Sequence, residues 1–142
     1  IKLSGKLDRL ELKPNSPAVT VVDYKTGAAK SRNEILGNTK NADGNYFRQL
    51  VFYKLLLDSL PNKKYNMMAG AIDFTEPYFA KASQGKPDFK FKKEVFEISN
   101  EHTKELKETI AKCTDEILNL KFWNKFCGEK DCEYCELRKL IS

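Results

Sequence analysis

Three charged side chains near the start of the chain are of the types that hydrolyse phosphate esters with a bound metal ion. Asp8 lies in a segment that reads Gly-Lys-Leu-Asp-Arg, and Asp23 and Lys25 lie in one that reads Val-Val-Asp-Tyr-Lys-Thr-Gly. Because side chains alternate between the faces of a strand, Asp23 and Lys25 would project together, and Tyr24 would point away with its carbonyl open to a cation. Two carboxylates and a carbonyl make the hard oxygen site that Mg²⁺ prefers. The pattern predicts a metal-assisted hydrolytic centre in which Lys25 orients or helps to deprotonate water.

The same residues also have a purely structural interpretation. Asp8 could pair with Arg9 at the surface, and residues 23–25 could be an ordinary solvent-facing strand end. An isolated Asp-x-Lys tripeptide occurs by chance in most proteins. The surrounding elements must therefore decide between the two interpretations.

The elements around these residues predict an antiparallel hairpin. Residues 1–13 alternate loosely between polar and apolar, and residues 18–25 are rich in Val and Thr, as strands are. The segment 14–17 reads Pro-Asn-Ser-Pro, which is turn chemistry. A hairpin places both Asp-bearing strands side by side. Residues 28–45 show no sustained periodicity and are expected to form a mobile surface loop.

The rest of the chain predicts a largely buried helix over 46–60, strands over 67–74 and 89–98, and a polar connection containing Gly85 and Pro87. Ser99 or Asn100 can cap a further helix. In that helix apolar residues recur at steps of four and three, which predicts one face on the core. These residues are Leu106, Ile110, Cys113, Ile117 and Leu120. Residues 122–142 form a Cys-bearing tail with aromatic anchors.

Length and composition predict one soluble domain over residues 1–142. The net charge is +5, which favours an anionic partner such as nucleic acid. No apolar run approaches the length of a membrane span, so no membrane partner is expected. The chain contains four Cys and begins without Met or a signal peptide. We therefore expect a reducing compartment, the cytoplasm by default, and a piece of a longer polypeptide.

Taken in order, these motifs closely resemble the core of RecB-like nucleases, the PD-(D/E)XK domains of helicase-nuclease subunits. The resemblance covers about residues 3–60 well and includes a Gln-x-x-x-Tyr motif on the helix after the sheet core, matched here by Gln49 and Tyr53. Spaced i and i+4, these two residues share a helix face and could hydrogen-bond phosphate or active-site groups, although a core Tyr and a surface Gln would show the same spacing. The resemblance implies an α/β, restriction-endonuclease-like fold with a mixed central sheet flanked by helices.

The resemblance further implies a Mg²⁺-dependent deoxyribonuclease, exonuclease or endonuclease, acting in DNA repair or recombination, with Mn²⁺ as a substitute ion. In the family both Asp residues are metal ligands and the Lys assists the catalytic base; these positions match Asp8, Asp23 and Lys25. The implied partners are DNA, single-stranded or with ends, and a helicase domain in the same polypeptide or complex. ATP would act only through that helicase, and the implied location is the bacterial cytoplasm, close to the nucleoid.

Two further interpretations remain open at this point. Some helicase-nuclease subunits keep this fold and lose the active site, so the chain could be a DNA-binding or scaffolding module. Retention of Asp8, Asp23 and Lys25 argues against that alternative. A zinc-binding interaction module built on the Cys tail would instead bind metal there and none at the two Asp residues.

One departure from the family concerns its upstream metal-binding His. His102 is the only His, and it lies well after the motifs, where we expect it in the first turn of a surface helix. Truncation of the family's opening helices would explain the missing ligand. We therefore expect the chain to fold, yet to cleave DNA weakly without the upstream segment.

A second departure concerns the Cys tail. Some relatives bind an iron–sulfur cluster with one upstream Cys and three near the C-terminus, and Cys127, Cys132 and Cys135 lie in that region. Their spacing differs from the cluster pattern C-x2-C-x5-C, since position 141 is Ile. Cys113 fits the buried stripe of its helix, where a thiol acts as a small hydrophobe. Iron–sulfur, zinc and unligated thiols all remain open, and unligated thiols are preferred.

Overall fold

The computed structural model of the protein describes residues 2–62, 64–80, 88–121, 123, 125 and 127–140. The chain divides into two compact units, residues 1–106 and 107–142. The prediction of a single domain stays a prediction. The elements in chain order are β1 (Arg9–Leu12), β2 (Ala18–Lys25), α1 (Arg32–Leu36), α2 (Asn45–Asp58), β3 (Asn66–Ala80), β4 (Asp88–Glu97), α3 (Asn100–Leu118) and α4 (Glu133–Lys139).

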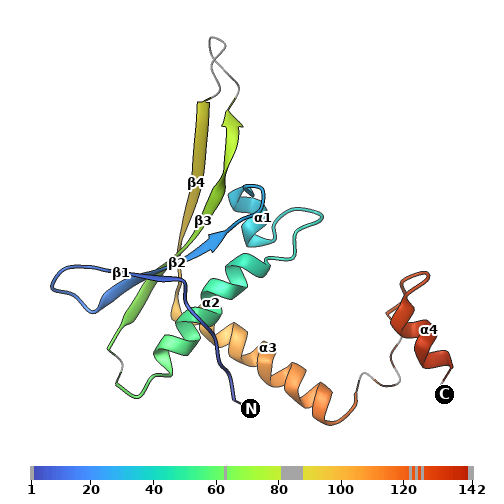
Figure 1. The fold of residues 1–142 in the computed structure, drawn as a ribbon. Helices are drawn as coiled ribbons and strands as arrows, with labels where there is room; N and C mark the ends of the chain where they lie inside the picture. The colour runs from blue at the N-terminus through green and yellow to red at the C-terminus, as the bar shows by residue number, and fades with distance from the viewer. Residues whose placement is uncertain are drawn as a thin grey trace. The chain divides into compact units, whose positions relative to one another are not determined.

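The first unit is built on a mixed sheet of four strands in the order β1-β2-β3-β4 (Figure 1). β1 and β2 form the predicted antiparallel hairpin, with Arg9 opposite Val22. β2 and β3 are parallel, and β3 and β4 are antiparallel. A parallel pair needs a long crossover, and here α1 and α2 provide it. The predicted α/β fold with a mixed central sheet and flanking helices is confirmed.

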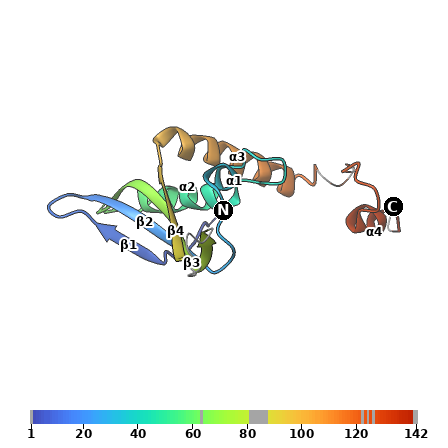
Figure 2. The same cartoon turned by 90° about the horizontal axis from the view of Figure 1, so that it is seen from above.

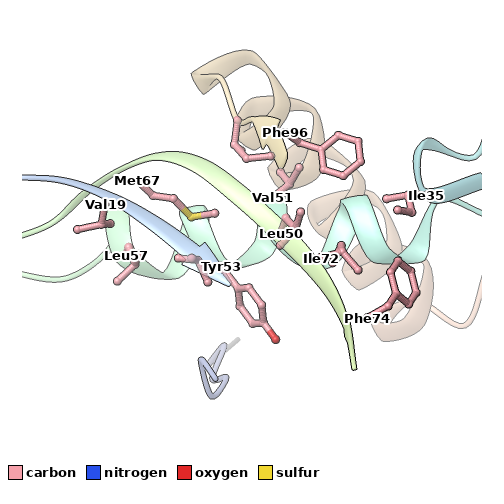
Figure 3. Packing of buried hydrophobic residues seen from close by; sticks show 12 residues of the cluster. Val19, Ile35, Leu50, Val51, Tyr53, Leu57, Met67, Ile72, Phe74 and Phe96 are labelled. Carbon is pink, nitrogen blue, oxygen red and sulfur yellow. The ribbon is translucent and has the colours of Figure 1, made fainter. Parts of the chain in front are cut away.

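Helix α2 lies along one face of the sheet, against β2 and β3 (Figures 1 and 2). Its apolar side chains pack on those of the sheet, as the close view of the core shows (Figure 3). Leu50 of α2 is fully buried, and a Cβ built on Gly70 of β3 would lie 3.0 Å from its side chain. The glycine thus permits the close approach of helix and sheet, which brings the polar residues of α2 to the end of β2.

The alternation along β2 places the chemistry-bearing residues at the end of the core. Val19 and Val21 face α2 and belong to the apolar cluster. Asp23 and Lys25 follow at the same period of two, and therefore continue on the α2 face of the sheet. A bulge between Val19 and Thr20 in the pairing with β3 lies before this stretch, so the register from Thr20 to Lys25 is continuous.

The expected mobile loop over 28–45 is wrong in part, because it contains α1. Ser31 caps this short helix, and its side chain exchanges hydrogen bonds with Glu34 in a capping box. Ile35 is buried in the core. A single helical turn gives no periodicity to detect, although the Ser-x-x-Glu pattern was present in the sequence. The predicted helix over 46–60 is confirmed as α2.

Strands 67–74 and 89–98 are confirmed as β3 and β4, whereas the expected connection with Gly85 and Pro87 lies outside the described residues. The predicted cap of α3 is confirmed, since Ser99 Oγ accepts a hydrogen bond from the His102 N–H. Among the described residues, no helix is both long and apolar enough to cross a membrane.

The prediction that α3 lays one full apolar face on the core is wrong. Leu106 packs against the cluster, and Ile110 is half-buried. Cys113, Ile117 and Leu120 are exposed. Helical periodicity specifies which side chains share a face, but it does not specify what covers that face.

Candidate active site

The carboxylate of Asp23 lies at the centre of a polar network at the end of β2. Asp23 is only 2% exposed, although it is a charged residue. Its Oδ1 atom accepts a hydrogen bond from Gln49 Nε2 at 2.9 Å and one from the Tyr53 hydroxyl at 2.8 Å. A buried carboxylate is costly unless it is paired and hydrogen-bonded, and two fixed donors restrict it to one orientation.

Lys25 projects beside Asp23, as the strand alternation predicts. Its Nζ atom lies 2.8 Å from Asp23 Oδ2 and donates a hydrogen bond to Gln49 Oε1 at 2.7 Å. Tyr24 between them points away and is 38% exposed. The ammonium is therefore held between a strand carboxylate and a helix amide, with its side chain 19% exposed.

Helix α2 supplies the two residues that hold Asp23 from the other side. Gln49 and Tyr53 are one turn apart, and Gln49 Nε2 also donates to the Tyr53 hydroxyl at 2.6 Å. The Tyr53 ring belongs to the apolar cluster, while its hydroxyl points away from that cluster (Figure 3). Among the interpretations left open by the sequence, the structure thus shows both a core tyrosine and a hydrogen bond to the site.

Burial, together with the hydrogen bond to the anionic Asp23, raises the pKa of Tyr53 to about 12. Because the folded-state pKa lies above the ordinary value of 10.0, the neutral hydroxyl stabilises the fold fully below pH 10. That contribution is lost as the pH rises from 10.0 through about 12. We predict that the free energy of unfolding of the wild type falls relative to that of Tyr53→Phe over this window, as measured by urea titration at several pH values. A constant difference between the two proteins would contradict this proton linkage.

Asp8 occupies a slightly different place from the predicted one. It lies in the bend immediately before β1, not on the strand, and it is exposed. Its Oδ2 atom accepts a hydrogen bond from the Tyr24 backbone N–H at 3.0 Å. Continuing the register from Arg9 opposite Val22 by one residue sets Asp8 opposite Asp23. Directly opposed residues share a face of an antiparallel pair, so both carboxylates belong to the same end of the hairpin.

The donor set at this end suits a hard divalent cation. Asp23 Oδ2 is buried and accepts no hydrogen bond from the described residues. Its close neighbour is the Lys25 ammonium, whose 2.8 Å contact is an ion pair without hydrogen-bond geometry at that oxygen. A buried carboxylate oxygen with an unused lone pair, on a strand whose register sets Asp8 opposite Asp23, fits the oxygen coordination of Mg²⁺. The assignment of Asp8, Asp23 and the Tyr24 carbonyl as ligands stays a prediction.

Two residues that the sequence did not single out complete the surroundings of Lys25. The Tyr46 ring lies 4.6 Å from Lys25 Nζ and 4.5 Å from Lys30 Nζ, measured to the ring centroid. Tyr46 is half-buried and packs near Phe74. One aromatic ring thus holds two ammonium groups at the same site. Lys30 lies in the connection before α1, and no local pattern in the sequence relates it to Lys25.

His102 is confirmed in the first turn of α3, but it is half-buried. Its Nδ1 atom accepts a hydrogen bond from the Ser99 backbone N–H at 3.1 Å, and its ring stands edge-on to Phe47. These contacts give His102 a capping and packing role. The three tail cysteines, Cys127, Cys132 and Cys135, are brought together in the second unit, whereas Cys113 is exposed on α3.

Comparison with known protein families matches residues 1–140 to the PD-(D/E)XK nuclease superfamily. No curated protein and no solved structure matches the chain. The family match extends over the hairpin with Asp8, Asp23 and Lys25, over α2 and over the Cys tail. The mixed sheet with flanking helices agrees with the restriction-endonuclease-like fold expected for such a protein. The chain therefore belongs to the PD-(D/E)XK nuclease superfamily.

Proposed function

We propose that this protein hydrolyses phosphodiester bonds of DNA with Mg²⁺, or with Mn²⁺ as a substitute, at Asp8, Asp23 and Lys25. One observation carries the proposal. A nearly fully buried carboxylate, Asp23, is fixed by Gln49 and Tyr53 and paired with Lys25, and it keeps one oxygen without a hydrogen bond. A surface strand end would need none of this apparatus, because solvent would satisfy its charges.

The residues divide the chemistry between them. Asp23 and Asp8 would hold the ion, with the Tyr24 carbonyl as a third oxygen. When bound, Mg²⁺ supplies Lewis acidity, which lowers the pKa of a coordinated water and polarises the phosphoryl oxygens. Hydrolysis forms a bond from water oxygen to phosphorus and breaks the bond from phosphorus to the leaving sugar oxygen.

The roles of the remaining residues follow from their contacts. Lys25 would orient the attacking water through its ammonium and offset negative charge that develops on the phosphoryl group. Gln49 holds Asp23 through its amide nitrogen and Lys25 through its amide oxygen, so one side chain sets their relative position. Tyr53 holds the same carboxylate through the hydrogen bond that its hydroxyl donates to Asp23 Oδ1. Gln49 and Tyr53 are positioning residues in this proposal.

Lys30 is proposed to contact a DNA phosphate beside the site, because its ammonium lies over the same Tyr46 ring as the Lys25 ammonium. We predict that Lys30→Ala weakens binding to single-stranded DNA and lowers the slope of log affinity against log salt by about 0.7, the value for one phosphate contact. Fluorescence anisotropy at several salt concentrations measures both quantities. Lys93→Ala, which removes a lysine paired with Glu11, is the matched control and should leave the slope unchanged. An unchanged slope for Lys30→Ala would remove it from the interface.

The biological setting rests on the resemblance to RecB-like domains and extends the proposal. It comprises a helicase domain in the same polypeptide or complex, ATP used only by that helicase, and DNA that is single-stranded or has ends. It also includes a role in repair or recombination and a cytoplasmic location. The net charge of +5 supports a polyanionic substrate.

The test of the proposed function is cleavage of labelled single-stranded and linear double-stranded DNA by the protein. We expect cleavage with Mg²⁺ or Mn²⁺ and none with a chelator. If an upstream His is needed, as the family resemblance implies, an N-terminally extended protein should cleave faster. DNA binding without cleavage by either protein, at any Mg²⁺ or Mn²⁺ concentration, would instead support a degenerate DNA-binding module.

A further inference from the structure

Three thiols of the second unit lie close enough to share one metal ion. The Sγ atoms of Cys127, Cys132 and Cys135 all lie within 4.8 Å of one another, and those of Cys127 and Cys135 are 3.4 Å apart. Among the described residues, this is the only group of three or more His, Cys, Asp or Glu side chains with that proximity. The three residues are free thiols, and a separation of 3.4 Å is far longer than a disulfide bond of about 2.05 Å.

The backbone between these cysteines turns sharply enough to let their side chains converge. Gly128, the residue after Cys127, has a φ of 77°, in the left-handed region that favours glycine.

The backbone conformation of the residue before Cys132 also helps to bring the thiols together. Asp131 has a φ of 61°, which is uncommon for a residue other than Gly and costs conformational energy. The turn that results brings Cys132 to Cys127 across only four intervening residues.

The sulfur separations discriminate between kinds of metal centre. In a tetrahedral zinc site with Zn–S bonds of about 2.3 Å, the sulfurs are roughly 3.8 Å apart. In an iron–sulfur cluster the Cys ligands bind different irons, so the protein sulfurs spread further apart than around one shared ion. The 3.4 Å contact and the 4.8 Å limit therefore favour a single ion over a cluster.

We propose that Cys127, Cys132 and Cys135 bind one soft divalent ion of the zinc type, with water or an exogenous ligand in the fourth position. The ion would cross-link a loop and α4 in a unit that has few buried apolar residues among those described. Metal binding would thereby contribute free energy to the folding of the second unit. This proposal differs from the sequence-based expectation of unligated thiols. It does not depend on the proposed nuclease activity.

The test starts with the whole protein, purified in reductant without a metal-affinity tag and stripped with a chelator. Zinc should rebind at one ion per chain, and Co²⁺ should give the absorption of a cobalt–thiolate complex. Before zinc is added all four thiols should react with a thiol reagent, and afterwards only Cys113 should react rapidly. This protection is measured on the wild type, so it does not depend on a variant that folds.

Single substitutions locate the ion. Cys132→Ser and Cys135→Ser should each weaken zinc binding at least about tenfold, since even residues that only support a metal ligand cost 10–100-fold. Cys113→Ser, which removes another exposed thiol, should bind zinc as the wild type does. The proposal is overturned by four thiols that stay reactive at saturating zinc, by a disulfide in place of bound metal, or by stoichiometric iron and sulfide.

Discussion

Asp23→Asn is expected to slow DNA cleavage by about a thousandfold, the scale of losing one preorganised electrostatic group at a reacting centre. The substitution keeps the size of the side chain and the oxygen that accepts from Gln49 and Tyr53. It removes the negative charge and replaces Oδ2, the oxygen without a hydrogen bond, with an NH₂ group that cannot bind a cation. DNA affinity should change little, because phosphate contacts elsewhere set it.

Asp73→Asn is the matched control for Asp23→Asn. Asp73 lies on β3 opposite Tyr24 and therefore on the other face of the sheet. The Asp73→Asn variant should cleave DNA at the wild-type rate. Circular dichroism and urea unfolding of both variants verify that any loss is chemical. Cleavage by Asp23→Asn within a few-fold of the wild type would rule out Asp23 as a metal ligand.

Lys25→Met is expected to reduce the cleavage rate by about a hundredfold or more while metal binding is retained. Met keeps the unbranched stem near the Tyr46 ring and removes the ammonium that contacts Asp23 and Gln49. Without that ammonium, Asp23 has no competing cation, so Mn²⁺ should bind as tightly as in the wild type or more tightly. This separation of rate from affinity distinguishes Lys25 from the carboxylates.

Lys93→Met is the corresponding control, since Lys93 pairs with Glu11 and has no contact with the network. Its cleavage rate and Mn²⁺ affinity should both match those of the wild type. Weaker Mn²⁺ binding by Lys25→Met, together with an unchanged maximal rate, would assign Lys25 to holding the fold of the site and not to the reaction.

The sequence was informative where short-range geometry decides the outcome. The period of two along a strand was sufficient to place Asp23 and Lys25 on one face, and the period of the helix placed Gln49 and Tyr53 together. The turn chemistry of residues 14–17 gave the hairpin. These local rules hold because neighbouring residues in regular structure have fixed relative positions.

The sequence was less informative where long-range contacts decide. The ring of Tyr46 meets Lys25 and Lys30 only after α2 packs on the sheet. The exposed position of Cys113 was missed because the apolar period of a helix does not show whether another element packs on its apolar face. The convergence of Cys127, Cys132 and Cys135 depends on loop angles at Gly128 and Asp131. Gly and Asp tolerate a positive φ, but their presence does not specify where the chain adopts one.

The most direct test of the site is Mn²⁺ binding by the wild type, Asp8→Ala and Glu11→Ala. Binding is measured as loss of the electron paramagnetic resonance signal of free Mn²⁺. Both substitutions remove one exposed or half-buried carboxylate from the same hairpin, but only Asp8 hydrogen-bonds the Tyr24 backbone beside Asp23. We predict that Asp8→Ala weakens Mn²⁺ binding by at least about tenfold, because few protein ligands hold the ion. Glu11→Ala should bind as the wild type does. Equal Mn²⁺ affinity in all three proteins, or no binding by the wild type in the presence of DNA, would contradict a metal-dependent nuclease centre at Asp8, Asp23 and Lys25.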